Sequence, residues 1–437
     1  MDISIFGLGY VGAVSAGCLA ADGHNVIGVD PNWTKVDLIN SGVSPIVEQD
    51  IGNMIADEVK SGRLRATTSV EDAVNESDIS LICVGTPSQM NGNLDLSHVR
   101  RVCEEIGEAL RGKSKYHVVV ARSTMLPGSM RDVVIPTLES ASGKKQAGVD
   151  FGVCNNPEFL REGTAVWDYY HPPKTVIGET DPRAGEVLTQ LYGELDAPLI
   201  RTSVDVAEMV KYADNNWHAL KVAFANEIGS VSKAVGIDGR RVMEIFCEDT
   251  KLNLSAYYMR PGFAFGGSCL PKDVRALTYK ARNLDLDVPL LNSILPSNRS
   301  QVARAIEMIT AKGKRKVGVL GFAFKSGTDD LRESPIVDVI EHLLGKGYDL
   351  RLYDGAVNMA ALTGANRDYI LNLIPHISRL MVSTIKEVLE FADTIVIGNG
   401  DPEFSAAVDS ARPDQTVVDF VRASGRASGG NYDGICW

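Results

Sequence analysis

Paired cysteines are missing from this sequence. Its seven cysteines are odd in number, widely scattered and never spaced as CxxC; they are Cys18, Cys83, Cys103, Cys154, Cys247, Cys269 and Cys436. Such spacing indicates neither a disulfide framework nor a zinc site. We therefore expect free thiols in a reducing compartment, and no bound metal.

Long apolar runs and an excess of positive charge are also absent. No apolar stretch approaches the ~20 residues needed to cross a bilayer, and the opening MDISIFGLGYVG begins a strand pattern without a basic segment. The net charge is -12, which disfavours a nucleic-acid backbone or an anionic membrane as the main partner, although a local basic pocket for phosphates remains possible. We expect a cytoplasmic protein that binds neither nucleic acid nor membrane.

The rest of the sequence is typical of a large globular α/β protein. With 437 residues, 44% hydrophobic and 23% charged, it can form roughly two to four domains. Short β-branched runs alternate with helical stretches up to residue 202 and again from residue 312, which predicts two Rossmann-like doubly wound domains, 1–202 and 312–437, built on parallel sheets. Residues 423–434 (ASGRASGGNYDG) are predicted to form a poorly ordered end.

A central helical domain, residues 203–311, is expected to join these two domains. From residue 206 to 231 apolar side chains recur every three or four positions without a proline. This period predicts one long helix of about thirty residues, roughly 45 Å in length. Because such a helix exceeds the needs of a small domain, we expect it to form part of a subunit interface.

A dinucleotide fingerprint follows the first predicted strand. Gly7, Gly9 and Gly12 open an apolar helix, and the next strand, NVIGVD, ends in Asp30. The three glycines would allow a tight turn, close approach of a pyrophosphate and close helix packing, while Asp30 would bind a ribose hydroxyl. Because Asp30 would repel a 2′-phosphate, the pattern favours NAD over NADP.

Two other phosphate-site candidates are weaker. GEALRGKS, from Gly107 to Ser114, fits the P-loop pattern but ends a helical stretch instead of following a strand, so we reject ATP binding there. The second α/β domain begins KVGVLGFAFKSGTDD without a GxGxxG, which leaves one NAD site. Lys325 and Arg332, near its first turn, could contact phosphates or could be solvated surface charges.

Cys269 lies in the unusual segment FAFGGSCLPKD, residues 263–273. A cysteine is most often a small core residue. Here Gly266 and Gly267 would let a substrate approach the sulfur, and Lys272 would favour a thiolate. Beside an NAD domain, this indicates oxidation of an aldehyde through a hemithioacetal and a thioester.

Two further clusters of polar residues could serve the same chemistry. NNPEFLREG follows a strand and carries Glu158 and Glu162, which could equally be solvated. Lys211, Asn215 and His218 share one face of the long helix, and the alternative is an ordinary solvent face.

Seven motifs in order resemble one family over nearly the whole chain. They are GLGYVG, VGTP (84–87), RST (122–124), NPEFLREG, EMVKYADNNWHALKVAFANE, YYMRPGFAFGGSCLPKD and FKSGTDDLRESP. The chain resembles the nucleotide-sugar 6-dehydrogenases of the UDP-glucose/GDP-mannose dehydrogenase family. The resemblance implies oxidation of a sugar C6 alcohol to a carboxylate with two successive NAD, without metal, and an active site shared between subunits of a homodimer or larger homo-oligomer.

The resemblance also implies roles for individual residues. Cys269 would be the nucleophile, assisted in proton transfer and in oxyanion or water handling by Lys211, Asn215, Asp273, Glu158 and Thr124. The NAD contacts would be Gly7, Gly9, Tyr10, Val11, Gly12, Asp30, Lys35, Thr86, Thr124, Lys272 and Arg332. The sugar-nucleotide contacts would be Glu162, Lys211, Asn215, His218, Asn226, Tyr257, Tyr258, Arg260, Phe263, Gly266 and Lys325.

The substrate rests on resemblance within the family. Residues 257–279 and the ending DGICW are similar to members that act on GDP-mannose, which implies GDP-mannuronate as product, for a uronate polysaccharide such as alginate. UDP-glucose is the alternative. Ala256 departs from the pattern, which has an arginine there. Two other functions stay open from the residues alone: a two-electron dehydrogenase in which Cys269 only packs, and an NAD-binding redox-sensing regulator.

Overall fold

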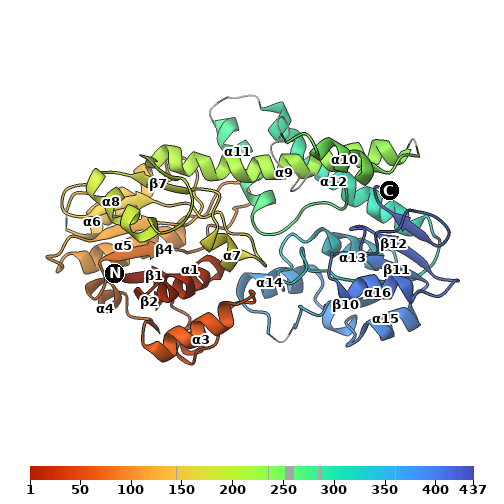
Figure 1. Cartoon of the computed structure of the whole chain (residues 1–437), viewed down its shortest axis with the longest axis horizontal. Helices are drawn as coiled ribbons and strands as arrows, with labels where there is room; N and C mark the ends of the chain where they lie inside the picture. Colours follow the sequence, from red (N-terminus) through yellow and green to blue (C-terminus); the bar gives the residue numbers. More distant parts are fainter. Residues whose placement is uncertain (144, 235, 251–259, 284, 286–287, 360) are drawn as a thin grey trace. The chain divides into compact units, whose positions relative to one another are not determined.

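The chain forms two compact units, Met1–Asp214 and Asn215–Trp437, each with its own sheet and core (Figure 1). The computed structural model describes residues 1–437 except 144, 235, 251–259, 284, 286–287 and 360. The predicted domain limits at 202/203 and 311/312 remain a prediction, because the division into compact units falls inside a long helix.

In the first unit the described residues form an eight-stranded sheet in the order β3-β2-β1-β4-β5-β6-β7-β8. Neighbouring strands are parallel except β6 and β7, which are antiparallel. The strands are β1 (Asp2–Phe6), β2 (Asn25–Val29), β3 (Leu64–Thr67), β4 (Ile79–Ile82), β5 (Val118–Ala121), β6 (Gly152–Asn155), β7 (Thr175–Glu179) and β8 (Leu199–Ser203). The order of the first six strands reverses between β1 and β4, which is where Rossmann-type sheets bind ligands.

Helices cover both faces of this sheet. One core packs against α1 (Tyr10–Ala21), α3 (Ile51–Ser61), α7 (Ala165–Tyr170) and α8 (Pro182–Tyr192). The other packs against α4 (Val70–Asn75), α5 (Ser97–Leu110), the π-helix η1 (Met130–Val134) and α6 (Ile135–Ala141), and α2 (Trp33–Asn40) follows β2. All four residues of β4 and all four of β5 are buried, as expected for a sheet covered on both faces.

The predicted helix of about thirty residues is confirmed as α9 (Val204–Ala234), the long green helix of Figure 1. In contrast to an ordinary surface helix, α9 buries several polar side chains and exposes several apolar ones. Lys211, Asn215 and Asn226 are buried, whereas Trp217 and Phe224 of the apolar stripe are exposed. A solvated polar face is therefore the wrong interpretation for Lys211 and Asn215.

The second unit has a five-stranded parallel sheet among its described residues, in the order β10-β9-β11-β12-β13. Its strands are β9 (Lys316–Leu320), β10 (Asp349–Tyr353), β11 (Thr394–Ile397), β12 (Thr416–Asp419) and β13 (Tyr432–Gly434). The helices before the sheet are α10 (Gly239–Cys247), α11 (Leu270–Asn283) and α12 (Pro289–Thr310). The core of the sheet includes residues of α12 and of the helices α13 (Pro335–Gly345), α14 (Gly364–Leu373), α15 (Ile385–Phe391) and α16 (Glu403–Asp409). The strand order reverses between β9 and β11.

The predicted fold class, two Rossmann-like domains with a long helix in the central region, is confirmed. The prediction of a loose end over 423–434 is wrong. Tyr432 lies in β13, which pairs with β12, and its hydroxyl donates to the Asp419 carboxylate at 2.8 Å. Strands β3 and β8 were not predicted either, because both are edge strands in which charged residues replace the continuous apolar run.

The P-loop-like sequence lies where its context indicated, at the end of α5. Lys113 is buried there, and its ammonium donates to the carbonyls of Val74 and Ser77, both at 2.5 Å. This lysine therefore joins α5 to the turn before β4 and serves packing. Within the part of the chain that the structure describes, no helix has the length and apolar character needed to span a bilayer.

Candidate active site

The glycine fingerprint forms the turn between β1 and α1. Gly7 has φ +96°, a left-handed conformation that favours glycine, and a Cβ on Gly12 would lie 1.8 Å from the Gly7 carbonyl oxygen. A Cβ on Gly9, by contrast, would meet no atom within 4 Å. The turn thus needs two glycines for its own geometry, while the third leaves open space at the N-terminus of α1. This arrangement fits a dinucleotide pyrophosphate.

Asp30 is fixed at the end of β2, beside this turn. Its carboxylate accepts the backbone N–H groups of Leu8 at 2.8 Å and Asn32 at 2.9 Å. The Lys35 ammonium lies 3.2 Å from the same carboxylate. Since each carboxylate oxygen can accept about two hydrogen bonds, Asp30 retains acceptor capacity for ribose hydroxyls. The predicted contacts Asp30 and Lys35 therefore lie together.

Tyr10, at the start of α1, belongs to a network that the sequence did not reveal. Its hydroxyl donates to the Glu48 carboxylate and accepts the Gly163 N–H at 3.0 Å. Glu48 also accepts the N–H groups of Gly163 and Ala165, at 2.7 and 2.9 Å. Glu48 thereby fixes the loop that carries Glu162. Val11, the next predicted NAD contact, is partly buried.

The loops after β4 and β5 bring Thr86 and Thr124 together. The Thr86 hydroxyl donates to the Thr124 carbonyl at 2.7 Å, and the neighbouring Ser123 hydroxyl donates to the Val84 carbonyl at 2.6 Å. Parallel strands end at the same sheet edge, so these loops lie at the edge where the glycine turn lies. Both threonines are thus placed where the NAD site was predicted.

Glu158 and Lys211 form a buried ion pair. The Lys211 ammonium lies 3.0 Å from the Glu158 carboxylate and donates to the Glu158 carbonyl at 2.6 Å. Burial alone would raise the pKa of Glu158, but the Lys211 ammonium, the Leu160 N–H and the Arg122 guanidinium outweigh it, so the pKa lies below its ordinary value. Glu158 is therefore a carboxylate at neutral pH, and the pair can hold or relay a proton.

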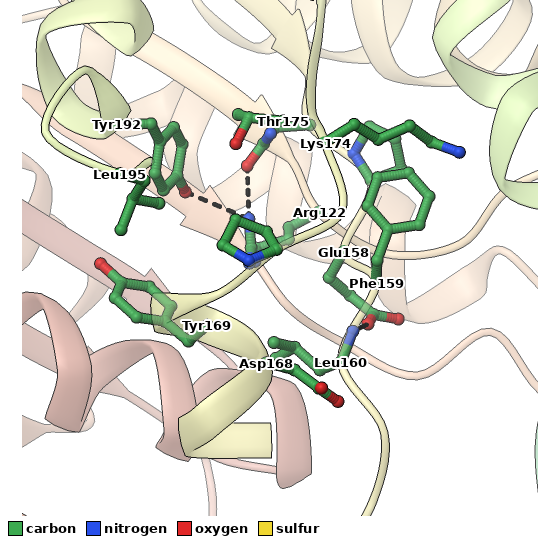
Figure 2. A pocket seen from close by; sticks show the side chains of 13 residues that line it. Arg122, Glu158, Phe159, Leu160, Asp168, Tyr169, Lys174, Thr175, Tyr192 and Leu195 are labelled. Carbon is green, nitrogen blue, oxygen red and sulfur yellow. Dashed lines mark hydrogen bonds between the residues drawn. The ribbon is translucent and has the colours of Figure 1, made fainter. Parts of the chain in front are cut away.

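Arg122 stabilises the charged form of Glu158 in this pair, and the sequence analysis assigned it no role. Its guanidinium donates to the Asn156 side chain and, at 3.1 Å, to the Tyr192 hydroxyl, while its Nε makes no hydrogen bond among the described residues. Figure 2 shows Arg122, Tyr192 and Glu158 around a pocket of about 30 Å³. That volume suits roughly one water molecule, so this pocket supports the site and does not itself accommodate a sugar nucleotide. The signal in the sequence was an arginine that follows a wholly apolar strand.

Cys269 differs from every other cysteine of the chain, all seven of which the structure describes. It is exposed, Cys247 is partly buried and the remaining five are buried. Burial raises the pKa of Cys83 and Cys103 to about 12 and that of Cys436 to about 11. The buried thiols therefore stay protonated at neutral pH, and Cys269 is the thiol that a substrate can reach.

The local fold explains why Cys269 is presented in this way. It immediately precedes α11, and its carbonyl accepts the Asp273 N–H at 2.9 Å. The N–H groups of a first helical turn carry partial positive charge, which favours a thiolate next to them. A Cβ on Gly266 would lie 2.3 Å from the Glu333 carbonyl oxygen, and Gly267 has φ +86° with the Phe324 ring 2.8 Å from its Cβ position. Both positions therefore require glycine.

Asp273 lies one turn after Cys269 and is almost completely buried. Its Oδ2 accepts a hydrogen bond from the Asn215 amide. Its Oδ1 makes no hydrogen bond among the described residues, although the Lys272 ammonium lies 3.4 Å away. A buried carboxylate oxygen with spare acceptor capacity beside a thiol can bind and orient a water molecule. The second unit thus brings Cys269, Asp273, Asn215 and Lys272 into one cluster.

The other predicted substrate contacts are spread over the second unit. Asn226 is buried, Phe263 and His218 are partly buried, and Arg260 is exposed. Lys325 follows β9, and Arg332 lies in the same connection to α13, where its guanidinium pairs with Asp330 at 2.6 Å. Tyr257, Tyr258 and the unusual Ala256 lie outside the described residues.

The glycine turn, the acid at the end of β2 and the exposed cysteine at a helix start define a dinucleotide-dependent oxidoreductase. Comparison with known proteins gives the family. Residues 1–196 match the NAD-binding domain of the UDP-glucose/GDP-mannose dehydrogenase family, residues 205–300 its central domain and residues 318–424 its UDP-binding domain. The chain belongs to this family, as its motifs predicted, and NAD is the family's cofactor.

Individual relatives resemble the chain over its full length. GDP-mannose 6-dehydrogenase from Pseudomonas aeruginosa is 57% identical over 437 residues, with 100% of both chains covered. UDP-glucose 6-dehydrogenase from Haloferax volcanii is 34% identical, again with 100% of both covered. A ternary complex of the P. aeruginosa enzyme has a TM-score of 0.58 with 100% of both chains covered. A UDP-glucose dehydrogenase from Pyrobaculum islandicum, 34% identical, has a TM-score of 0.89 with 100% of this chain and 97% of that chain covered.

Proposed function

We propose that this enzyme oxidises the C6 alcohol of GDP-mannose to the carboxylate of GDP-mannuronate, with two successive NAD and an intermediate bound to Cys269. The observation that carries the mechanism is the single exposed thiol at the start of α11, one turn from a buried carboxylate. Identities of 55–57% to enzymes named GDP-mannose 6-dehydrogenase support the substrate.

The first oxidation needs a base for the C6 hydroxyl proton. We assign this proton handling to the Lys211 and Glu158 pair, with the hydroxyl of Thr124 as a further polar contact. Glu158, which is held as a carboxylate, would accept the hydroxyl proton, and the Lys211 ammonium would stabilise the negative charge that develops on the oxygen as the proton leaves. NAD, when bound, accepts a hydride in each of the two oxidations. The product of this half is an aldehyde.

The second oxidation uses the thiol. The Cys269 thiol adds across the aldehyde carbonyl, its sulfur to the carbon and its proton to the oxygen. The resulting thiohemiacetal becomes a thioester when it loses the hydroxyl proton to solvent and a hydride from the same carbon. Asn215 and Lys211 would stabilise the oxyanion. Water held by Asp273 then attacks the thioester carbonyl, and the C–S bond breaks to release the carboxylate and the thiol. The remaining predicted contacts with NAD and with the sugar nucleotide stay proposals, including Lys272, Arg332, Glu162, His218 and Lys325.

Two experiments test this proposal. We expect Cys269→Ser to abolish steady formation of acid while leaving NAD affinity within about twofold, because a hydroxyl is a much weaker nucleophile at neutral pH. Mass spectrometry of enzyme mixed with GDP-mannose and NAD should show a covalent adduct on the Cys269 peptide of the wild type. An adduct on another cysteine, or full activity in the serine variant, would overturn the assignment.

Substrate choice is tested by equal concentrations of GDP-mannose, UDP-glucose and GDP-glucose. A site that hydrogen-bonds a distinguishing hydroxyl can reject an analogue lacking it by roughly 10⁴-fold. The proposal requires the highest kcat/KM with GDP-mannose. UDP-glucose as the best substrate would contradict it, and equal rates with GDP-glucose would mean that the base is recognised and the sugar is not. A role in supplying a uronate polysaccharide such as alginate follows only if GDP-mannuronate is the product.

We also propose a homodimer or larger homo-oligomer in which α9 forms part of the interface and the active site is shared. α9 exposes four large apolar side chains: Val206 (49%), Met209 (45%), Trp217 (44%) and Phe224 (41%). Such apolar side chains on one helix are typical of a surface that another protein covers. Trp217→Glu with Phe224→Glu should therefore yield monomers in light scattering; an unchanged mass would contradict this interface. None of the seven cysteines forms a disulfide in the structure, which supports a cytoplasmic location.

A further inference from the structure

The backbone of residues 261–265, which leads to Cys269, is bound by side chains. In a β-strand, these hydrogen bonds would come from the backbone of a neighbouring strand. Asn226 of α9 accepts the Gly262 N–H at 2.8 Å and donates to the Phe263 carbonyl at 2.9 Å. Asn298 of α12 accepts the Phe265 N–H at 2.9 Å and donates to its carbonyl at 2.8 Å. Residues 261–265 have no helix or strand of their own, so these carboxamides set the path of the backbone.

The Gly262 carbonyl is bound by two groups to which the proposed reaction gives no role. The Gln301 amide, one turn after Asn298 on α12, donates to it at 2.5 Å. The Cys436 thiol also points to this carbonyl at 3.7 Å, and Gln301 lies 3.4 Å from the Cys436 sulfur. Gln301 and Cys436 are 1% and 0% exposed. Water therefore has little access to replace either donor.

The chain's ending DGICW, residues 433–437, is seated beside the same segment. The Cys436 carbonyl accepts the Gly239 N–H at 3.1 Å, and a Cβ on Gly229 would lie 2.9 Å from the Cys436 sulfur. The Trp437 ring packs 5.0 Å from the Arg240 guanidinium, whose Nε donates to the Pro261 carbonyl at 3.2 Å. Lys233 and Lys312 both bind the Asp433 carboxylate, at 2.7 and 2.9 Å. The glycines make room for residues 433–437, and the charges anchor them.

We propose that Gln301, Cys436 and Trp437 are positioning residues that set the backbone of residues 261–263 and thereby the affinity for the sugar nucleotide. The proposal rests on the proposed function, in which Arg260 and Phe263 contact that substrate. In this proposal the three residues act through the Pro261 and Gly262 carbonyls. A displacement of ~1 Å in a segment that positions substrate can cost as much as 10²-fold in rate.

The test compares two buried glutamines of the second unit. Gln301→Met keeps the side-chain volume and removes the donor to Gly262. Gln415→Met is the matched control, because Gln415 is also 1% exposed and donates to two backbone carbonyls, those of Leu389 and Ala392, both at 2.7 Å. Both variants should lower the thermal midpoint, since each removes a buried amide donor from a backbone carbonyl. Only Gln301→Met should raise KM for GDP-mannose, by about tenfold or more, with NAD affinity within twofold.

Two Trp437 variants and the rate of Cys269 alkylation provide further tests. Trp437→Ala should raise the same KM, and Trp437→Phe, which keeps a ring against Arg240, should restore it. Alkylation of Cys269 by iodoacetamide, followed by mass spectrometry without substrate, should be faster in Gln301→Met than in Gln415→Met. If the wild type does not oxidise GDP-mannose, the proposed function fails, whereas the alkylation rates still decide the positioning role. Equal KM values and equal alkylation rates in the two glutamine variants would overturn it.

Discussion

Substituting the central glycine of the fingerprint tests the NAD site without disturbing the fold. Gly9 has φ -80° and ψ -164°, which any residue adopts, and an added Cβ would meet no atom within 4 Å. We therefore expect Gly9→Ala to change the free energy of unfolding by no more than about 0.5 kcal/mol. The methyl group would fill the space into which a pyrophosphate approaches, so NAD affinity should fall at least ~10-fold, or about 1.4 kcal/mol.

Gly12→Ala is the matched control for this experiment. Its Cβ would lie 1.8 Å from the Gly7 carbonyl oxygen, whereas unstrained heavy-atom contacts begin near ~3.5 Å. The helix must move by more than 1 Å, and overpacking of this kind costs about 1–3 kcal/mol. Thermal unfolding without NAD and titration calorimetry with NAD separate the two effects. Wild-type NAD affinity in Gly9→Ala would show that the open space is not the phosphate site.

Three further predictions follow from other buried groups. Burial lowers the pKa of His117 to about 3, so the free energy of unfolding should fall by up to ~1.4 kcal/mol per pH unit as the pH drops below ~6.5. His117→Gln should flatten the dependence of the unfolding midpoint on pH between 5 and 7, and the same dependence in wild type and variant would contradict this. Glu158→Gln and Lys211→Met should each lower the free energy of unfolding by about 3–5 kcal/mol, because each leaves one member of a buried ion pair without the other. The double variant should lose clearly less than the sum of the two losses. Additive losses in urea unfolding would contradict the coupling. Asp30→Ala should weaken NAD binding and relax the preference over NADP, and an unchanged ratio of kcat/KM for the two cofactors would mean that Asp30 does not face the ribose.

The parts of the fold that sequence patterns predicted are those encoded locally. The glycine turn before α1 and the length of α9 depend on neighbours within a few residues, and both agree with the structure. Pairing at sheet edges is not local in this sense. β13 has three residues and follows a glycine-rich stretch, so only its hydrogen bonds to β12 identify it as a strand.

The candidate site divides in the same way. Asp30 was recognisable because a fixed spacing relates it to the glycine turn. Glu48 and Gln301 were not recognisable. Glu48 binds a backbone N–H about 115 positions away and Gln301 a backbone carbonyl 39 positions away, and a single glutamate or glutamine gives no sequence motif. The burial of Lys211 was also hidden, because the apolar stripe of α9 suggested that the opposite face was solvated.

The proposed reaction is a four-electron oxidation through a thioester on Cys269. The most direct test is the number of NADH molecules formed for each GDP-mannose consumed, measured by absorbance at completion together with chromatography of the sugar nucleotide. We expect two NADH and a uronate product. One NADH and an aldehyde product would contradict it, because Cys269 would then take no part in the reaction.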